Sequence, residues 1–262
     1  MGTMNDFSFG WLTPIISYLI ATTGAAIGLH CTVRALAATG TGRRNWLLTA
    51  AAAIGTGIWT MHFVAILGLT VDGTELRYDV PLTMLSLAVA IMVVGAGVYA
   101  VGYGRQRALA ILLGGLGTGL GVAAMHYTGM AAIRIHGTFK YSPVAVALSV
   151  AIAILAATAG LWAAVTVRSN TSIIAAALVM GLAVSCMHYT GMAAAHVDLH
   201  PVRTGLDGAG PMEFVLPLSV CLGSFLLITY AFVALTPTPA ERAAYQHAGE
   251  GPGETALDPK GR

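Results

Sequence analysis

Hydrophobic residues in this chain form seven long runs that are separated by short polar connections. Each run has about 20 residues, which at a rise of 1.5 Å per residue is enough to cross roughly 30 Å of hydrocarbon. No run holds a lysine or an acidic residue in its middle. The pattern predicts an all-α membrane protein with seven transmembrane helices, over residues 13–36, 45–69, 80–103, 107–132, 144–167, 172–196 and 214–236.

The composition excludes several classes of protein. Of the 262 residues, 56% are hydrophobic and 9% are charged, whereas about 25% of the residues in a soluble domain are charged. The runs leave no room for a soluble catalytic domain, so we expect a multi-pass protein of the lipid bilayer that is not an enzyme. The net charge of +2 is small and dispersed, which argues against binding to nucleic acid.

Basic residues are unevenly divided between the two sets of connections. One set, together with the C-terminal tail, carries nine basic residues, and the other carries four with seven acidic residues. The positive-inside rule therefore predicts that the N-terminus lies outside and the C-terminus lies in the cytoplasm. The basic residues of the first set are Arg34, Arg43, Arg44, Arg105, Arg107, Arg168, Arg242, Lys260 and Arg262.

The two ends of the chain receive different interpretations. The first residues, MGTMNDFSFGWLTP, lack the positive segment of a secretory signal, so the first run is interpreted as a retained transmembrane helix. Residues 237–262 have proline, glycine and mixed charges without apolar periodicity. We expect one membrane domain over residues 1–236 and a disordered cytoplasmic tail that carries no output module.

Three stretches of the sequence resemble one another, at residues 55–69, 117–137 and 180–200, and the second and third share MHYTGMAA. Their histidines, His62, His126 and His188, are 64 and 62 residues apart. This spacing predicts three helix-pair repeats plus one helix. Because the motifs fall on the second, fourth and sixth helices, which run in one direction, we expect the three histidines at one depth, roughly 12 to 15 Å below the first outer charge.

Histidines at one depth with methionines beside them suggest a metal site. Met130 and Met192 follow their histidines by four residues, so thioether and imidazole share a helix face, and Gly129 and Gly191 would let neighbouring helices approach closely. Imidazole with thioether favours Cu(I), while imidazole alone also suits zinc or Cu(II). The candidate ligands are Met61, His62, Met125, His126, Met130, Met187, His188 and Met192, with Tyr127 and Tyr189 as orienting or packing partners.

Other interpretations stay open for some of these residues. A single buried histidine is often a packing residue whose nitrogens bind a hydroxyl or a carbonyl, although three at one depth favour a shared site. The first repeat departs from the motif through Phe63, Val64, Ala65 and Ile66, so it should contribute less. The outer histidines form an entry site or are solvated loop residues, and the second interpretation is favoured; they are His136, His196 and His200.

With these motifs, residues 11–236 resemble the bacterial MHYT domain, which is an integral-membrane sensory module. The resemblance implies copper near the outer face of a cytoplasmic (inner) membrane and a response to oxygen, carbon monoxide or nitric oxide. Members are often fused to cyclic di-GMP enzymes or histidine kinases, so a separate signalling partner is expected here. By the resemblance the site comprises Met61, His62, Met125, His126, Tyr127, Met187, His188 and Tyr189, with Phe63 at the first tyrosine position.

Three rivals to a copper-binding sensor remain. Copper delivery or transport requires exchangeable metal and a polar path, and no charged residue marks such a path through the inner half. A haem protein or metalloenzyme is compatible with facing histidines, but no carboxylate lies at their level to act as a general base. The third rival is a purely structural protein. Small residues on the helix faces are compatible with a homodimer.

Overall fold

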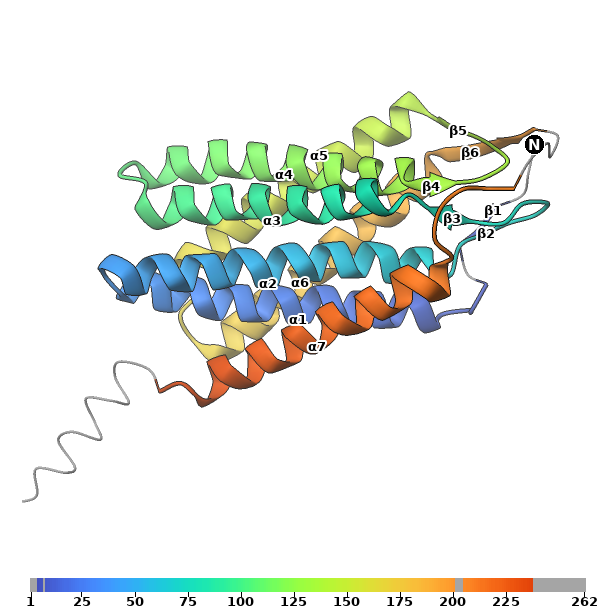
Figure 1. Ribbon diagram of the computed structural model, residues 1–262. Helices are drawn as coiled ribbons and strands as arrows, with labels where there is room; N and C mark the ends of the chain where they lie inside the picture. The colour runs from blue at the N-terminus through green and yellow to red at the C-terminus, as the bar shows by residue number, and fades with distance from the viewer. Residues whose placement is uncertain (1–3, 7, 201–204, 238–262) are drawn as a thin grey trace, which may run out of the picture.

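The computed structural model of this chain describes residues 4–6, 8–200 and 205–237, and its seven long helices confirm the predicted fold class (Figure 1). Each helix is long and apolar enough to span a membrane. A single π-helical turn, η1 (Pro211–Val215), precedes the last helix. The helices are α1 (Leu12–Ala37), α2 (Gly40–Ile66), α3 (Val80–Tyr103), α4 (Arg107–Ala131), α5 (Pro143–Thr166), α6 (Asn170–Ala193) and α7 (Leu216–Leu235).

The first six helices close into a ring. Each packs against its neighbours in sequence, and α6 packs back against α1. Helix α7 lies outside the ring, against α1 and α2 (Figure 1). The motif-bearing helices α2, α4 and α6 therefore alternate with α1, α3 and α5 around one interior, which is the arrangement that three helix-pair repeats plus one helix require.

Six short strands at one end of the bundle were not predicted. They form three antiparallel ribbons, β1–β2, β3–β4 and β5–β6 (Figure 1). Each ribbon joins the strand before an odd-numbered helix to the strand after the following even-numbered helix, so the repeating unit is strand, helix, helix, strand. The strands are β1 (Met4–Asn5), β2 (Thr70–Val71), β3 (Arg77–Tyr78), β4 (Ile133–Arg134), β5 (Gly137–Tyr141) and β6 (Ala195–Leu199).

Three predicted helix boundaries are wrong by three residues or more. Helix α2 ends at Ile66, not at residue 69, because the chain turns there into β2, which pairs with β1. Helix α2 begins at Gly40, not at residue 45, because the Arg43 Nε–H donates to the carbonyl oxygens of Ala35 and Ala38 and so holds these polar residues on the end of α1. Gly40 has a φ of +55°, which favours glycine at this tight turn. Helix α6 ends at Ala193, not at residue 196, because β6 pairs with β5. The predicted disordered tail falls, apart from Pro237, outside the described residues.

Ion pairs and a cap stabilise the strand end of the bundle. The Asp79 carboxylate pairs with Arg134 on β4 and accepts the backbone N–H of Leu82, so the pKa of Asp79 lies below its usual value. Across β5–β6, the Lys140 ammonium lies 2.6 Å from an Asp198 oxygen. This pair raises the pKa of Lys140 and lowers the pKa of Asp198.

Candidate metal centre

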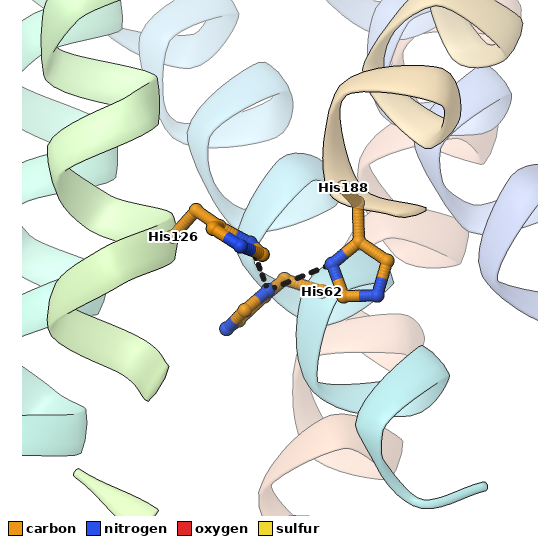
Figure 2. A group of neighbouring side chains, drawn as sticks. All are labelled: His62, His126 and His188. Atoms are coloured by element: carbon orange, nitrogen blue, oxygen red, sulfur yellow. Dashed lines mark hydrogen bonds between the residues drawn. The ribbon is translucent and has the colours of Figure 1, made fainter. Parts of the chain in front are cut away.

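The three motif histidines meet inside the ring of helices. His62, His126 and His188 lie four or five residues before the ends of α2, α4 and α6, so three helices running in one direction bring them to one level. Each ring is at most 1% exposed. The Nδ1 atom of His62 lies 3.0 Å from Nδ1 of His188 and 3.1 Å from Nδ1 of His126 (Figure 2). One nitrogen from each ring falls within 4.8 Å of the other two.

Protein hydrogen bonds alone do not satisfy this cluster. A neutral imidazole nitrogen carries either one proton or one lone pair, so Nδ1 of His62 cannot make a well-directed hydrogen bond with both neighbours. On the opposite edges of the rings, the Nε2 atoms of His62 and His126 are buried without a hydrogen-bond partner among the described residues. Buried polar groups are rarely left in this state, and an unpaired one costs free energy.

The donor set fits a metal ion. Three nitrogens that bind one ion at roughly 2.0 Å stand about 3.5 Å apart in a trigonal arrangement. The two separations at Nδ1 of His62, 3.0 and 3.1 Å, differ from that spacing by about half an ångström, and ligand atoms of all three rings lie within 4.8 Å of one another. Neutral imidazole is a common metal ligand. The site is therefore suited to a metal that accepts nitrogen ligands.

Two motif glycines make room for the histidine rings of neighbouring helices. A Cβ atom on Gly129 would lie 2.5 Å from Nε2 of His62, and a Cβ atom on Gly191 would collide with Nε2 of His126. The ring of His62 thus lies over Gly129 in the second repeat, and the ring of His126 lies over Gly191 in the third. Each glycine follows the histidine of its own motif by three residues. The corresponding position in the first repeat is Ala65. These glycines were expected to bring helices together, and here they accommodate a ring.

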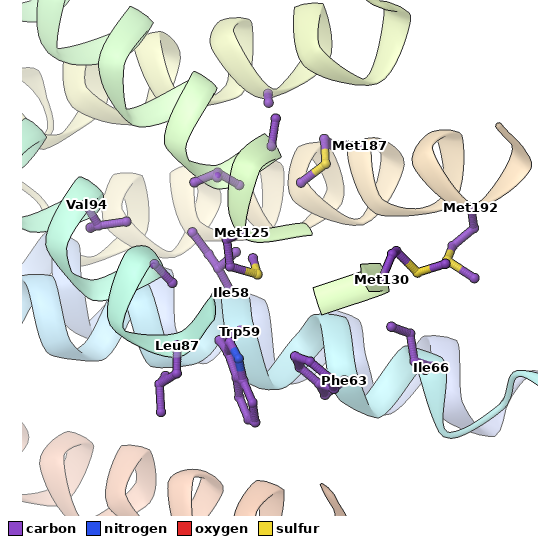
Figure 3. Packing of buried hydrophobic residues seen from close by; sticks show 14 of the residues in the cluster. Ile58, Trp59, Phe63, Ile66, Leu87, Val94, Met125, Met130, Met187 and Met192 are labelled. Carbon is purple, nitrogen blue, oxygen red and sulfur yellow. The ribbon is translucent and has the colours of Figure 1, made fainter. Parts of the chain in front are cut away.

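The predicted methionine ligands are all buried around the histidine level. Met61, Met125 and Met130 are fully buried, and Met187 and Met192 are at most 2% exposed. Figure 3 shows the side chains of Met130 and Met192 pointing toward one another. In the first repeat Ile66 takes the equivalent position. The methionines thus supply soft atoms to the surrounding core, and their role as metal ligands stays a prediction.

Aromatic rings fix the orientation of the imidazoles by contact. Tyr127 packs edge to face on His126, with ring centres 4.8 Å apart, and Tyr189 packs similarly on its own histidine at 4.9 Å. The Tyr127 hydroxyl bonds the Ser149 hydroxyl at 2.7 Å and not an imidazole. Phe63 makes the same ring contact as the tyrosines. The shared feature is the aromatic ring, which explains why phenylalanine can stand in the first motif.

The remaining outer histidines stay apart from this centre. His196 and His200 are exposed on or just after β6, and the half-buried His136 ring lies 3.3 Å from the Thr74 hydroxyl. Within the described part of the chain, the motif histidines form the one group of three or more histidine, cysteine or acidic side chains close enough to share an ion. Whether the outer histidines form an entry site or are solvated loop residues stays a prediction.

A pocket beside the centre was missed in the sequence. It has a volume of about 1030 Å³, lies at the strand end and is lined by Tyr127 and Met130 together with Asp79, Arg134 and Tyr141. Its walls come from the ribbons, which join residues far apart in the chain. No local pattern of the sequence could have indicated it.

Comparison with known proteins identifies the repeats. Residues 55–114, 119–177 and 181–242 match the MHYT family, described as a bacterial signalling protein N-terminal repeat. The chain is 40% identical over 233 residues to the bifunctional diguanylate cyclase/cyclic di-GMP phosphodiesterase MucR of Pseudomonas aeruginosa, which covers 84% of this chain and 33% of MucR. It is 43% identical over 170 residues to the cyclic di-GMP phosphodiesterase NbdA of the same organism, covering 63% of this chain and 22% of NbdA.

A third relative shows similarly partial coverage. The signaling protein YkoW of Bacillus subtilis is 31% identical over 201 residues, which is 73% of this chain and 25% of YkoW. The chain thus spans a third or less of the length of each of these relatives. No solved structure matches it.

Proposed function

Because this chain belongs to the MHYT family of bacterial signalling domains, we propose that it is a multi-pass sensor of the cytoplasmic membrane that holds a copper ion. The observation that carries the proposal is the buried convergence of the imidazole rings of His62, His126 and His188. Among the described residues, the Nε2 atoms of His62 and His126 have no hydrogen-bond partner. The bound ion would supply a redox-active centre and a coordination position for a diatomic molecule such as oxygen, carbon monoxide or nitric oxide.

The surroundings favour copper over zinc and haem. Thioethers are soft ligands that select Cu(I), and six buried methionine and histidine side chains of α4 and α6 gather at this level. Haem bound between two histidines needs a flat macrocycle between its axial ligands. The histidine rings are in direct contact at about 3 Å, so a macrocycle would have to separate the helices.

The helix that carries one ligand also offers a route for output. Helix α2 holds His62 near one end, and near its other end it contacts α7. There the Arg34 guanidinium of α1 donates to the Val233 carbonyl at 2.8 Å and covers the Trp46 ring of α2. The centre of the Trp46 ring lies 6.4 Å from that of Phe232 on α7. A change in histidine geometry that shifts α2 would therefore move the last turn of α7.

The proposed recipient of the signal lies on the cytoplasmic side. The names of two relatives include synthesis or degradation of cyclic di-GMP, which makes an enzyme of that chemistry the candidate signalling partner. In this proposal the membrane domain itself has no catalytic role. It changes between two helix arrangements, and the partner responds to the difference.

Copper handling is the second candidate function. The pocket of about 1030 Å³ at the strand end reaches Tyr127 and Met130, next to the histidines. A carrier needs such access for loading and release. Rapid exchange of bound copper with a chelator would favour handling, whereas slow exchange would favour a resident sensor ion.

Elemental analysis of the full chain tests the proposal. The protein is purified in mild detergent without chelators, and bound metals are measured by mass spectrometry in the wild type and in the variant with His126→Ala and His188→Ala. A variant with His196→Ala and His200→Ala, both exposed, is the matched control. We expect about one copper per chain in the wild type and the control and none in the first variant.

Either of two results would contradict the assignment. The first is folded wild-type protein that binds no copper even when Cu(I) is supplied. The second is stoichiometric copper retained after both motif histidines are removed.

A further inference from the structure

A small cavity lies inside the ring of helices, next to the histidine level and on the side away from the ribbons. Ile58, Val122 and Val184 line it, and each precedes the motif histidine of its helix by four residues. One turn further, Ile54 and Met180 line it as well. Residues four apart share a helix face, so the three repeats build this cavity directly under the three imidazoles. Its volume is about 50 Å³.

The cavity exists because one helix of the ring presents small side chains to it. Helix α5 contributes one large side chain, Leu161, and five small residues, whereas α3 contributes Val94 and Val98. The small residues are Ala153, Ala156, Ala157, Gly160 and Ala164. Interiors normally pack without voids larger than a water molecule. The missing volume therefore lies on the α5 side of the interior.

The lining is too apolar to hold water well. Among the lining residues Thr118 has the one hydroxyl group, and its proton is donated to the Val93 carbonyl at 3.2 Å. The other lining side chains are hydrocarbon or thioether. A buried water needs two to four polar partners, and apolar cavities stay dry and accept apolar solutes.

The size of the cavity limits the ligand. Its volume of about 50 Å³ is the space open to the centre of a water-sized sphere, and one water needs about 10 to 15 Å³ of it, so the cavity admits one small molecule. Small apolar molecules dissolve in the hydrocarbon around the helices and can enter between them. Ions and hydrogen-bonding metabolites are excluded by the cost of losing their hydration.

We propose that this cavity is a binding site for one small uncharged apolar molecule. Binding here needs no metal. Met187 lines the cavity and directly precedes His188, so an occupant would press on the residues that support the imidazoles. That consequence for signalling rests on the proposed sensor function, whereas the binding site itself does not.

Xenon is the probe for this site, because it is apolar, uncharged and compact. The full chain is placed in lipid nanodiscs with ¹³C-labelled methyl groups, and methyl shifts of Ile58, Val122 and Val184 are followed as xenon pressure rises. Ala157→Leu fills the cavity. Ala159→Leu, two residues further on α5 and exposed to lipid, is the matched control.

We expect saturable shifts in the wild type and in the Ala159→Leu variant and at least tenfold weaker binding in the Ala157→Leu variant. Shifts that are absent or do not saturate in the wild type would overturn the proposal, as would unchanged binding in folded Ala157→Leu protein. If that variant does not fold, the smaller change Ala156→Val takes its place, with the same expectation of weaker binding. Copper is measured on the same samples, so failure of the metal assignment is recorded separately from failure of the cavity.

Discussion

The substitution Gly129→Ala tests how the histidine cluster is built. The added Cβ atom would lie 2.5 Å from Nε2 and 3.0 Å from Cδ2 of His62, and 3.3 Å from Cζ of Phe63. Ordinary contacts between heavy atoms are about 3.5 Å or longer. The imidazole therefore has to move by about 1 Å, which is a third of its 3.0 Å separation from the next Nδ1 atom.

The magnitude follows from that displacement. A functional constellation must be held within about 0.5 Å of its working geometry, so we expect the affinity for Cu(I) to fall at least tenfold, or about 1.4 kcal/mol. Alanine is a better helix former than glycine by about 1 kcal/mol. Overpacking a core costs about 1 to 3 kcal/mol, so the net stability should stay equal or fall, despite the gain in helix propensity.

Gly117→Ala is the matched control, because Gly117 lies on the same helix and a Cβ there meets nothing within 4 Å. Cu(I) affinity is measured by competition with a chromophoric chelator, and stability is measured by thermal unfolding in detergent. The control should bind copper like the wild type. Wild-type copper affinity in the Gly129→Ala variant, with the protein shown to be folded, would refute the proposal that Gly129 leaves the space that the His62 ring needs.

Three further predictions concern neighbouring parts of the structure. Gly191→Ala should displace His126 and weaken Cu(I) binding as strongly as the first substitution; an effect no larger than that of Gly117→Ala would contradict the repeat symmetry. Tyr127→Phe keeps the ring but loses one hydrogen bond, so thermal unfolding should show a loss of about 1 kcal/mol with unchanged copper affinity. The ion pair with Lys140 lowers the pKa of Asp198, so the stability that this pair contributes is complete above about pH 4 and is lost as the pH falls further. Between pH 6 and pH 3 the melting temperature of the Asp198→Asn variant should therefore fall less than that of the wild type.

The helices and the histidine level could be predicted from the sequence because both depend on local or repeated patterns. Seven apolar runs have one stable solution in a bilayer, since every backbone group must be satisfied within its own helix. The 64- and 62-residue spacings then bring His62, His126 and His188 to one depth. Residue type and depth alone were sufficient to nominate them as a group.

The rest depends on contacts that no local pattern encodes. Strands of two residues, such as Thr70–Val71, are too short to show an alternation of polar and apolar positions. The role of Gly129 depends on a ring from another repeat, and the small cavity depends on side chains from six helices. The start of α2 at Gly40 depends on Arg43 reaching the end of α1.

X-ray absorption at the copper edge tests the central claim most directly, because it reports the atoms bound to the ion. The wild-type full chain, loaded with one equivalent of Cu(I), should show nitrogen ligands with the outer-shell scattering of imidazole rings. This signal should be reduced in the His62→Ala variant. Copper bound by sulfur or oxygen alone, or an imidazole signal unchanged by that substitution, would contradict a metal centre built from the three converging histidines.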